Sequence, residues 1–240
     1  MIYMFRTLSI CLLAVVSLST LAESQRLRIV TEHWPPYNYL DTDGTLRGEA
    51  TDNVRRILAQ ANLDANIELL SWSKALDLAN HRPNTLIFSI LRSEERENSF
   101  DWYCPLSDPI EVALYKLRKR DDIRLTDLND AKKYTIGVLR NDYAQQFLKS
   151  KGFDDGTNLQ VSTSDTANLR LLIQGRIDLV IQVKAAIHYR MKQLGAPIEE
   201  VEIALPAIDG KSLETCLALS KGSDKAIKVA LDRAIEALTP

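Results

Sequence analysis

Short apolar runs alternate with amphipathic segments along the chain. Apolar or alternating runs are typical of strands, and apolar residues spaced by three and four are typical of helices. The pattern predicts strands at 26–32, 67–70, 85–91, 101–103, 110–116, 135–139, 177–182, 200–205 and 216–220. It predicts helices at 51–61, 73–79, 142–149, 165–174, 185–194 and 224–237, with a polar turn or short helix at 93–97.

The first strand and helix are separated by an aromatic, proline-containing stretch. The segment 34–37 (Trp-Pro-Pro-Tyr) cannot continue a sheet because proline lacks the backbone N–H, so we expect a rigid loop there. The helix predicted at 51–61 places Val54 on its apolar face. Thr51 or Asp52 is available at its start as the N-cap, because either side chain accepts a bond from a free backbone N–H.

The order of the elements is typical of an α/β protein. Up to residue 91 they alternate as β-α-β-α-β, which favours parallel strands flanked by helices. A second alternating unit runs from 135 to 205, and the last strand and helix are expected to return to the first unit. In this class of fold, ligands bind at the carboxyl ends of the strands.

Composition and net charge indicate a globular protein and disfavour nucleic acid and anionic lipid as partners. Of the 240 residues, 45% are apolar and 26% charged, as in a globular protein with one large or two small domains. With 30 basic and 32 acidic residues the net charge is −2, so no large positive field draws the chain to nucleic acid or anionic lipid. We expect no nucleic acid partner.

The first 22 residues have the pattern of a secretory signal. A short segment with one positive charge, 1–6, precedes the uncharged apolar run 7–21, and Ala22 is a small residue of the kind favoured at cleavage sites. The run is shorter than the roughly 20 residues of a transmembrane helix, so an N-terminal anchor is the weaker alternative. Cys11 lies inside this run after an isoleucine, which disfavours a lipid anchor. We expect cleavage of 1–22, export to the periplasm and no membrane anchor.

Two cysteines, Cys104 and Cys216, remain after cleavage. An oxidising compartment allows them to form a disulfide, provided that their Cα atoms lie within roughly 7 Å. The alternative is two separate buried thiols that pack as small hydrophobic groups. Neither cysteine has the surroundings of a catalytic thiol.

Six pieces in order resemble one known family. They read LRIVTEHWPPYNYLDTDGTLRGEATDNVRRILAQ, SWSKAL, FSILRSEERENSFDWYCPL, YTIGVLRNDYAQQFL, GRIDLVIQ and LALSKGSDKAIKVALDRAIEAL. Each is weak alone, but the ordered set, which covers nearly the whole mature chain, is similar to the extracytoplasmic solute-binding proteins of family 3. These are the polar amino acid receptors of ABC importers.

The resemblance implies a type II periplasmic-binding-protein fold. Two lobes, each a mixed sheet flanked by helices, are joined by two hinge strands, here expected at 110–117 and 216–220, and close on the ligand. The expected first lobe comprises 23–112 and 213–240, and the second comprises 113–212. This arrangement also places Cys104 and Cys216 near the hinge, which favours the disulfide.

The resemblance assigns a carboxylate site to the first lobe. Arg96 matches the family arginine that grips the α-carboxylate of the ligand, a task suited to the planar fork of a guanidinium. Ser89 and Ser93, at the neighbouring strand end and turn, are expected to complete the site with hydroxyl and backbone donors. The alternatives are that Arg96 pairs with adjacent glutamates on a solvated turn and that the hydroxyls only cap that turn.

Further ligand contacts are expected from a loop and from aromatic residues. Asn141 and Asp142 match the second-lobe loop whose amides meet the ligand, although both residue types also serve as helix caps. Trp34, Tyr37 and Trp72 are expected to stack on the ligand or to close the cleft, with core packing as the alternative.

One departure from the family concerns the amino group of the ligand. An acidic residue usually follows the strand that matches IDLVIQ and takes the ammonium, but here Gln182 is followed by Val183. An ammonium buried against valine would be unpaired, which is costly. Either Asp142 or Asp165 takes its place, or the ligand lacks an amino group.

We expect a monomeric binding protein that captures a small carboxylate-bearing solute for an inner-membrane ABC permease and needs no cofactor. The motifs of common enzymes are absent, and His33, His81 and His188 lack the spacing of a zinc site. The alternatives are a dehydratase-like enzyme of the same fold, with Asp142 as the proton-transfer group, or a sensory protein that docks to a signalling receptor.

Overall fold

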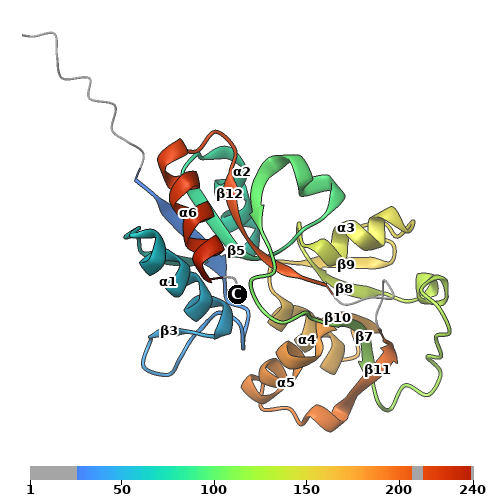
Figure 1. The fold of residues 1–240 in the computed structure, drawn as a ribbon. Coiled ribbons are helices and arrows are strands. Elements are labelled where there is room, and N and C mark those ends of the chain that lie inside the picture. Colours follow the sequence, from blue (N-terminus) through green and yellow to red (C-terminus); the bar gives the residue numbers. More distant parts are fainter. Residues whose placement is uncertain (1–25, 207–212, 239–240) are drawn as a thin grey trace, which may run out of the picture.

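A computed structural model describes residues 26–206 and 213–238. It contains two lobes, each built on a five-stranded sheet (Figure 1). The expected signal segment 1–22, with Cys11, lies outside the described residues. Among the helices that are described, none combines the length and the apolar character needed to cross a bilayer.

The first-lobe sheet has the strand order β4-β1-β5-β12-β6. Strands β4, β1 and β5 are parallel, as the β-α-β-α-β alternation predicted, and β12 pairs with both β5 and β6 in antiparallel register. The last strand therefore returns to the first unit, as expected. The bounds are β1 Arg28–Glu32, β4 Ile67–Leu70, β5 Thr85–Leu91, β6 Phe100–Tyr103 and β12 Thr215–Ser220.

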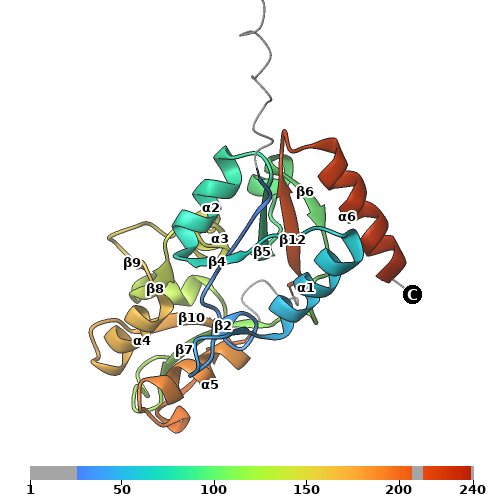
Figure 2. The ribbon, with the colours of Figure 1, turned by 90° about the vertical axis from the view of Figure 1, so that its left-hand side faces the viewer.

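Helices cover both faces of this sheet (Figure 2). On one face lie α1 (Glu49–Ala61) and α6 (Lys225–Leu238), which pack against each other, and on the other lies α2 (Trp72–His81). The side chains of β5 alternate between the two cores, with Leu86 in the first and Ile87 in the second.

The N-cap expected for α1 was wrong. The cap is Gly48, whereas Thr51 and Asp52 lie in the first turn of the helix. Gly48 has φ 121°, and a Cβ there would lie 2.2 Å from the Tyr37 carbonyl oxygen, so this close approach requires glycine. Asp52 still favours the helix, because a carboxylate in the first turn interacts with the positive end of the dipole.

The second-lobe sheet has the order β11-β7-β10-β8-β9. Helices α4 and α5 pack on one face and α3 on the other, so β7 is buried throughout instead of alternating. The bounds are β7 Val112–Leu117, β8 Ile136–Leu139, β9 Leu159–Ser162, β10 Leu179–Val183, β11 Val201–Leu205, α3 Tyr143–Ser150, α4 Asp165–Ile173 and α5 Lys184–Gln193.

Several short elements were not expected from the sequence. Strand β9 is an edge strand of four residues. The others are the hairpin β2 (Tyr39–Leu40) with β3 (Leu46–Arg47), and the 3-10 helices η2 (Asn129–Lys133) and η3 (Ile198–Glu200). The expected polar turn after β5 is the 3-10 helix η1 (Glu94–Ser99).

The two crossings between the lobes run side by side. Just before β7 and β12, Ile110 and Leu213 exchange two backbone hydrogen bonds of 2.8 Å, and each strand then joins the sheet of one lobe. Close by, Cys104 and Cys216 are joined by a disulfide with a Cα–Cα distance of 4.5 Å. We propose lobe boundaries at 112/113 and 212/213; Val112, the first residue of β7, already pairs with Val183 in the second-lobe sheet.

Candidate functional site

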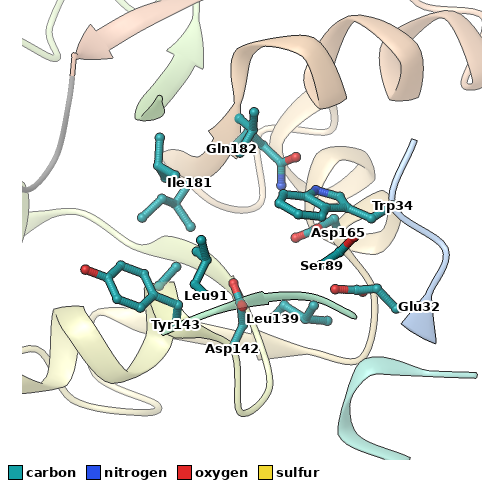
Figure 3. A pocket seen from close by; sticks show the side chains of 13 residues that line it. Glu32, Trp34, Ser89, Leu91, Leu139, Asp142, Tyr143, Asp165, Ile181 and Gln182 are labelled. Atoms are coloured by element: carbon teal, nitrogen blue, oxygen red, sulfur yellow. The ribbon is translucent and has the colours of Figure 1, made fainter. Parts of the chain in front are cut away.

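A small cavity of about 50 Å³ lies between the lobes (Figure 3). It has room for only a few water molecules, so a solute of amino acid size needs the lobes to separate before it can enter. Both lobes contribute to its wall. The lining residues are Glu32, Trp34, Ser89, Leu91, Val112, Leu139, Asp142, Tyr143, Ala144, Asp165, Ile181, Gln182 and Val183.

The first lobe contributes the carboxyl ends of its parallel strands. Glu32 is the last residue of β1, and the indole of Trp34 follows it, with its ring centroid 4.8 Å from that of Tyr37. Because β1 and β5 are parallel neighbours, their ends bring Glu32 and Ser89 to the same edge of the sheet. The end of β1 and the loop after it therefore present an acid and an aromatic ring to the cavity.

Ser89 lies at a bulge inside β5. The pairing with β12 passes from Ile90 directly to Phe88, and Ser89 has φ 59°, a left-handed conformation that is uncommon for serine. Its hydroxyl donates to Asn38 Oδ1 at 2.5 Å, and Asn38 in turn donates to Thr31. Ser89 lines the cavity, but its hydroxyl proton is used within the lobe.

The second lobe adds two carboxylates at helix starts. Asp142 is the N-cap residue of α3, and Asp165 is the first residue of α4, whose N-cap Ser164 accepts a bond from the Ala167 N–H. Helix N-termini favour such negative charges. Val183, which stands where the family usually has an acid, lines the same cavity.

A buried arginine holds Asp165 in place. Arg190, on α5, donates to Gln182 Oε1 at 2.6 Å and forms a 2.9 Å ion pair with Asp165. The Arg190 side chain is only 4% exposed and that of Asp165 15%, so each charge depends on the other for compensation. Arg190 therefore holds the Asp165 carboxylate at the cavity wall as part of a neutral pair.

Burial and neighbouring carboxylates raise the pKa values of Glu32 and Asp142 at the cavity. Burial, followed by the charges of Asp165 and Asp142, raises the pKa of Glu32 well above its usual value, and Arg190 and Arg96 oppose this shift only in part. Burial also raises the pKa of Asp142, against the opposing charge of Arg96. Figure 3 shows the three carboxylates turned toward the space around Trp34. Like-charge repulsion therefore acts among the carboxylates at this site.

Arg96 and Ser93 lie behind this wall, on η1 and at its N-cap. Arg96 is 4% exposed and donates through Nη1 to the Leu91 carbonyl at 3.1 Å and through Nη2 to the Asn141 carbonyl at 2.8 Å. Among the described residues, neither its buried Nε nor the buried Oγ of Ser93 has a hydrogen-bond partner.

Three other expected contacts do not line the cavity. Tyr37 is buried beneath Trp34, and Trp72 packs in the first-lobe core under α2. Asn141 is exposed, and its backbone carbonyl, rather than its side chain, accepts bonds from the first lobe. The structure thus brings Trp34, Ser89 and Asp142 to the cavity and sets the other predicted residues around it.

Glu32 and Arg190 were not among the residues expected from the sequence. Glu32 could have been found as the only acid at the carboxyl end of the first strand, where this fold class binds ligands. Arg190 interrupts the buried face formed by Ile187 and Met191, which is a signal for a paired charge. Within the described ranges, no cluster of side chains is suited to hold a metal ion.

Comparison with known proteins agrees with this architecture. A curated relative, the L-cystine-binding protein TcyJ of Escherichia coli K12, is 22% identical over 243 aligned positions, which cover 95% of this chain and 87% of that protein.

Solved structures show the same fold. A histidine kinase sensor domain similar to periplasmic binding proteins aligns with TM-score 0.76 and 18% identity, covering 90% of this chain and 91% of that one. An ancestral arginine-binding protein bound to arginine aligns with TM-score 0.74 and 21% identity, covering 89% and 92%. The profile of one family matches residues 27–239. The chain therefore belongs to family 3 of the bacterial extracellular solute-binding proteins.

Proposed function

We propose that this protein captures a small zwitterionic solute, bearing both a carboxylate and an ammonium group, between its lobes for an ABC importer. The observation that carries the proposal is that hydrogen-bond donors suited to a carboxylate lie near carboxylates suited to an ammonium group. Within the part of the chain that the structure describes, Arg96 on η1 and Ser93 at its N-cap each keep a buried polar atom without a partner, and three carboxylates line the cavity. An amino acid or a close analogue has both groups that such a site requires.

The carboxylate of the solute is assigned to Arg96 and Ser93. A buried donor without an acceptor is unfavourable, and a carboxylate oxygen is the acceptor that a guanidinium binds most strongly. Arg96 keeps its charge despite burial, because the reduction of its pKa starts from a very high value. When the lobes separate, its Nη2 also becomes free from the Asn141 carbonyl.

The ammonium group is assigned to Asp142, Asp165 and Glu32. These acids take over the task of the residue that Val183 replaces, so the valine does not exclude an amine. Asp165 is fixed by Arg190 and needs no rearrangement to receive a cation. That a matched relative binds cystine and a structural neighbour binds arginine, both amino acids, supports the same class of solute.

A thermal-shift screen tests this assignment. Amino acids, including cystine and arginine, are compared with their N-acetyl derivatives, which lack the ammonium, and their decarboxylated amines, which lack the carboxylate. A solute that binds only the native state raises the melting temperature with its concentration. We expect a rise only for compounds that carry both groups. An equal rise with simple organic acids would contradict the ammonium assignment, and an equal rise with amines would contradict the carboxylate assignment.

Binding, rather than catalysis, is the role that we assign to Asp142. The family, the cystine-binding relative and the arginine-binding structural neighbour are named as binding proteins. A solute found in the screen should be recovered unchanged after prolonged incubation with the protein, as measured by mass spectrometry. Conversion of the solute would instead support the dehydratase-like alternative.

Export and delivery complete the proposal. We infer that residues 1–22 are removed on passage to the periplasm, so the purified mature protein should begin at Glu23 on N-terminal sequencing. Delivery predicts that cells accumulate the labelled solute more slowly when this protein is deleted. Normal uptake in the deletion strain, combined with tight binding, would favour a sensory role.

A further inference from the structure

A group of hydrogen bonds joins the lobes directly beside the cavity, apart from the ring contact between Tyr39 and Tyr189. Trp72 Nε1 donates to the Asn141 carbonyl at 2.9 Å, and Arg96 Nη2 donates to the same oxygen at 2.8 Å. Ser73 Oγ donates to the neighbouring Arg140 carbonyl at 3.3 Å. We call the five residues of these hydrogen bonds the lobe latch.

Both sides of the lobe latch are held in position before they meet. Trp72 is the first residue of α2, is 3% exposed and packs in the core formed with Val30 and Ile87. On the other side, Asn141 has φ 59°, and its N–H donates to Gln145 Oε1 at 2.7 Å. This turn directs the Asn141 carbonyl at the first lobe, and its two lone pairs accommodate both donors.

The lobe latch lies outside the lining of the cavity, although one of its members, Arg96, is also the residue to which we assign the solute carboxylate. None of its five residues is among the thirteen that line the wall. Its hydrogen bonds join protein to protein, and those that Trp72 and Ser73 donate involve no residue that we assign to the solute. An interaction present in only one of two states shifts the equilibrium toward that state.

We propose that Trp72 is a positioning residue that sets the open–closed equilibrium of this protein through its bond to the Asn141 carbonyl. The indole N–H is satisfied by the second lobe in the closed state and by water in the open state. Loss of one such net hydrogen bond lowers the ratio of closed to open molecules roughly 2- to 10-fold. Solute affinity falls by up to the same factor, because the solute must then supply the free energy of closure.

The test compares two tryptophan variants. Trp72→Phe keeps an aromatic ring and removes the N–H donor. Trp102→Phe is the matched control, because the Trp102 indole donates to the Glu97 carbonyl within the same lobe at 3.0 Å. Spin labels at the exposed positions Asn80, on α2, and Ser150, on α3, report the distance between the lobes.

Double electron–electron resonance measures the distances between the two spin labels in protein without added solute. We expect the long-distance population to increase several-fold in Trp72→Phe and to stay unchanged in Trp102→Phe. Ser73→Ala, a milder change on the same helix, should shift the population in the same direction and keeps the test valid if Trp72→Phe folds poorly. Identical distributions in the parent, Trp72→Phe and Ser73→Ala would overturn the proposal. An equal shift in Trp102→Phe would also overturn it, because it would indicate general loosening of the first lobe.

Discussion

The guanidinium of Arg96 in the first lobe donates to the backbone carbonyl of Asn141 in the second at 2.8 Å. The same guanidinium lies over the Trp72 ring, with 5.4 Å between its carbon and the ring centroid, and retains a buried Nε without a partner among the described residues. Arg96 therefore contacts both lobes and still has a donor for a solute. A residue of this kind links solute binding to closure.

Replacement of Arg96 should affect binding more than folding. In Arg96→Ala, we expect the affinity for the solute found in the screen to fall at least tenfold, because a charge-assisted hydrogen bond is lost, a loss of about 1.4 kcal/mol or more. Calorimetric titration measures this change. Arg92→Ala is the matched control, since Arg92 is exposed and pairs with Glu97 on the same turn. Equal affinity in the parent and Arg96→Ala would reject the carboxylate assignment.

Glu32 should make stability depend on pH. Its pKa in the folded state is raised, mainly by burial and then by Asp165 and Asp142, while Arg190 and Arg96 oppose the shift. As pH rises above the unfolded value of about 4.3, the unfolded state loses its proton first, so the free energy of unfolding falls through this window. Above the raised pKa of Glu32, its carboxyl is ionised in both states and the free energy of unfolding falls no further on its account.

Glu32→Gln removes the titrating carboxyl, so comparison with the parent measures its contribution to the free energy of unfolding. We expect the variant to be more stable than the parent at neutral pH, with the difference closing below about pH 4, where the carboxyl is protonated in both states. Urea titrations from pH 4 to 8 give the comparison. A variant that is less stable at every pH would mean that the Glu32 charge is favourable in the folded protein.

The Arg190–Asp165 pair should matter for folding. Arg190→Met leaves the Asp165 carboxylate uncompensated in a largely buried site, so we expect the free energy of unfolding to fall by about 3–5 kcal/mol. In the double variant with Asp165→Asn, much of this loss should be recovered, since no charge is then stranded. Arg118→Met is the control, because the 60% exposed Arg118 side chain pairs with Glu202 at the surface and should contribute less than about 1 kcal/mol. Equal effects of the two single variants in urea titrations would show that burial does not strengthen the pair.

The disulfide should stabilise the chain as a whole. Cys104 and Cys216 are separated by 112 positions, and closing a loop of that length contributes about 4–5 kcal/mol in the chain-entropy model. We expect the double variant Cys104→Ser, Cys216→Ser to lose most of this free energy in guanidinium titrations. Adding a reductant should destabilise the parent and leave the variant unchanged. A difference below about 1 kcal/mol would show that the bond contributes little to equilibrium stability.

Periodicity along the chain was sufficient to predict the longer strands and the α-helices. The strand predicted at 85–91 is β5, and the parallel neighbours and returning last strand follow from the alternation of elements. The extents of single strands and helices depend on residues close in sequence, whose spacing is visible directly. The short edge strand β9 was missed because it carries little periodicity of its own.

Residue chemistry and family resemblance together indicated a small solute, an arginine at the first-lobe turn and a disulfide near the hinge. The roles of individual side chains depended on contacts across the molecule. Glu32 and Asp165, 133 positions apart, come to one cavity, and Trp72 turns out to reach the second lobe rather than the solute space. The role of such a side chain depends on its burial and on the charges that folding brings near it. Neither can be read from the neighbouring residues in the sequence.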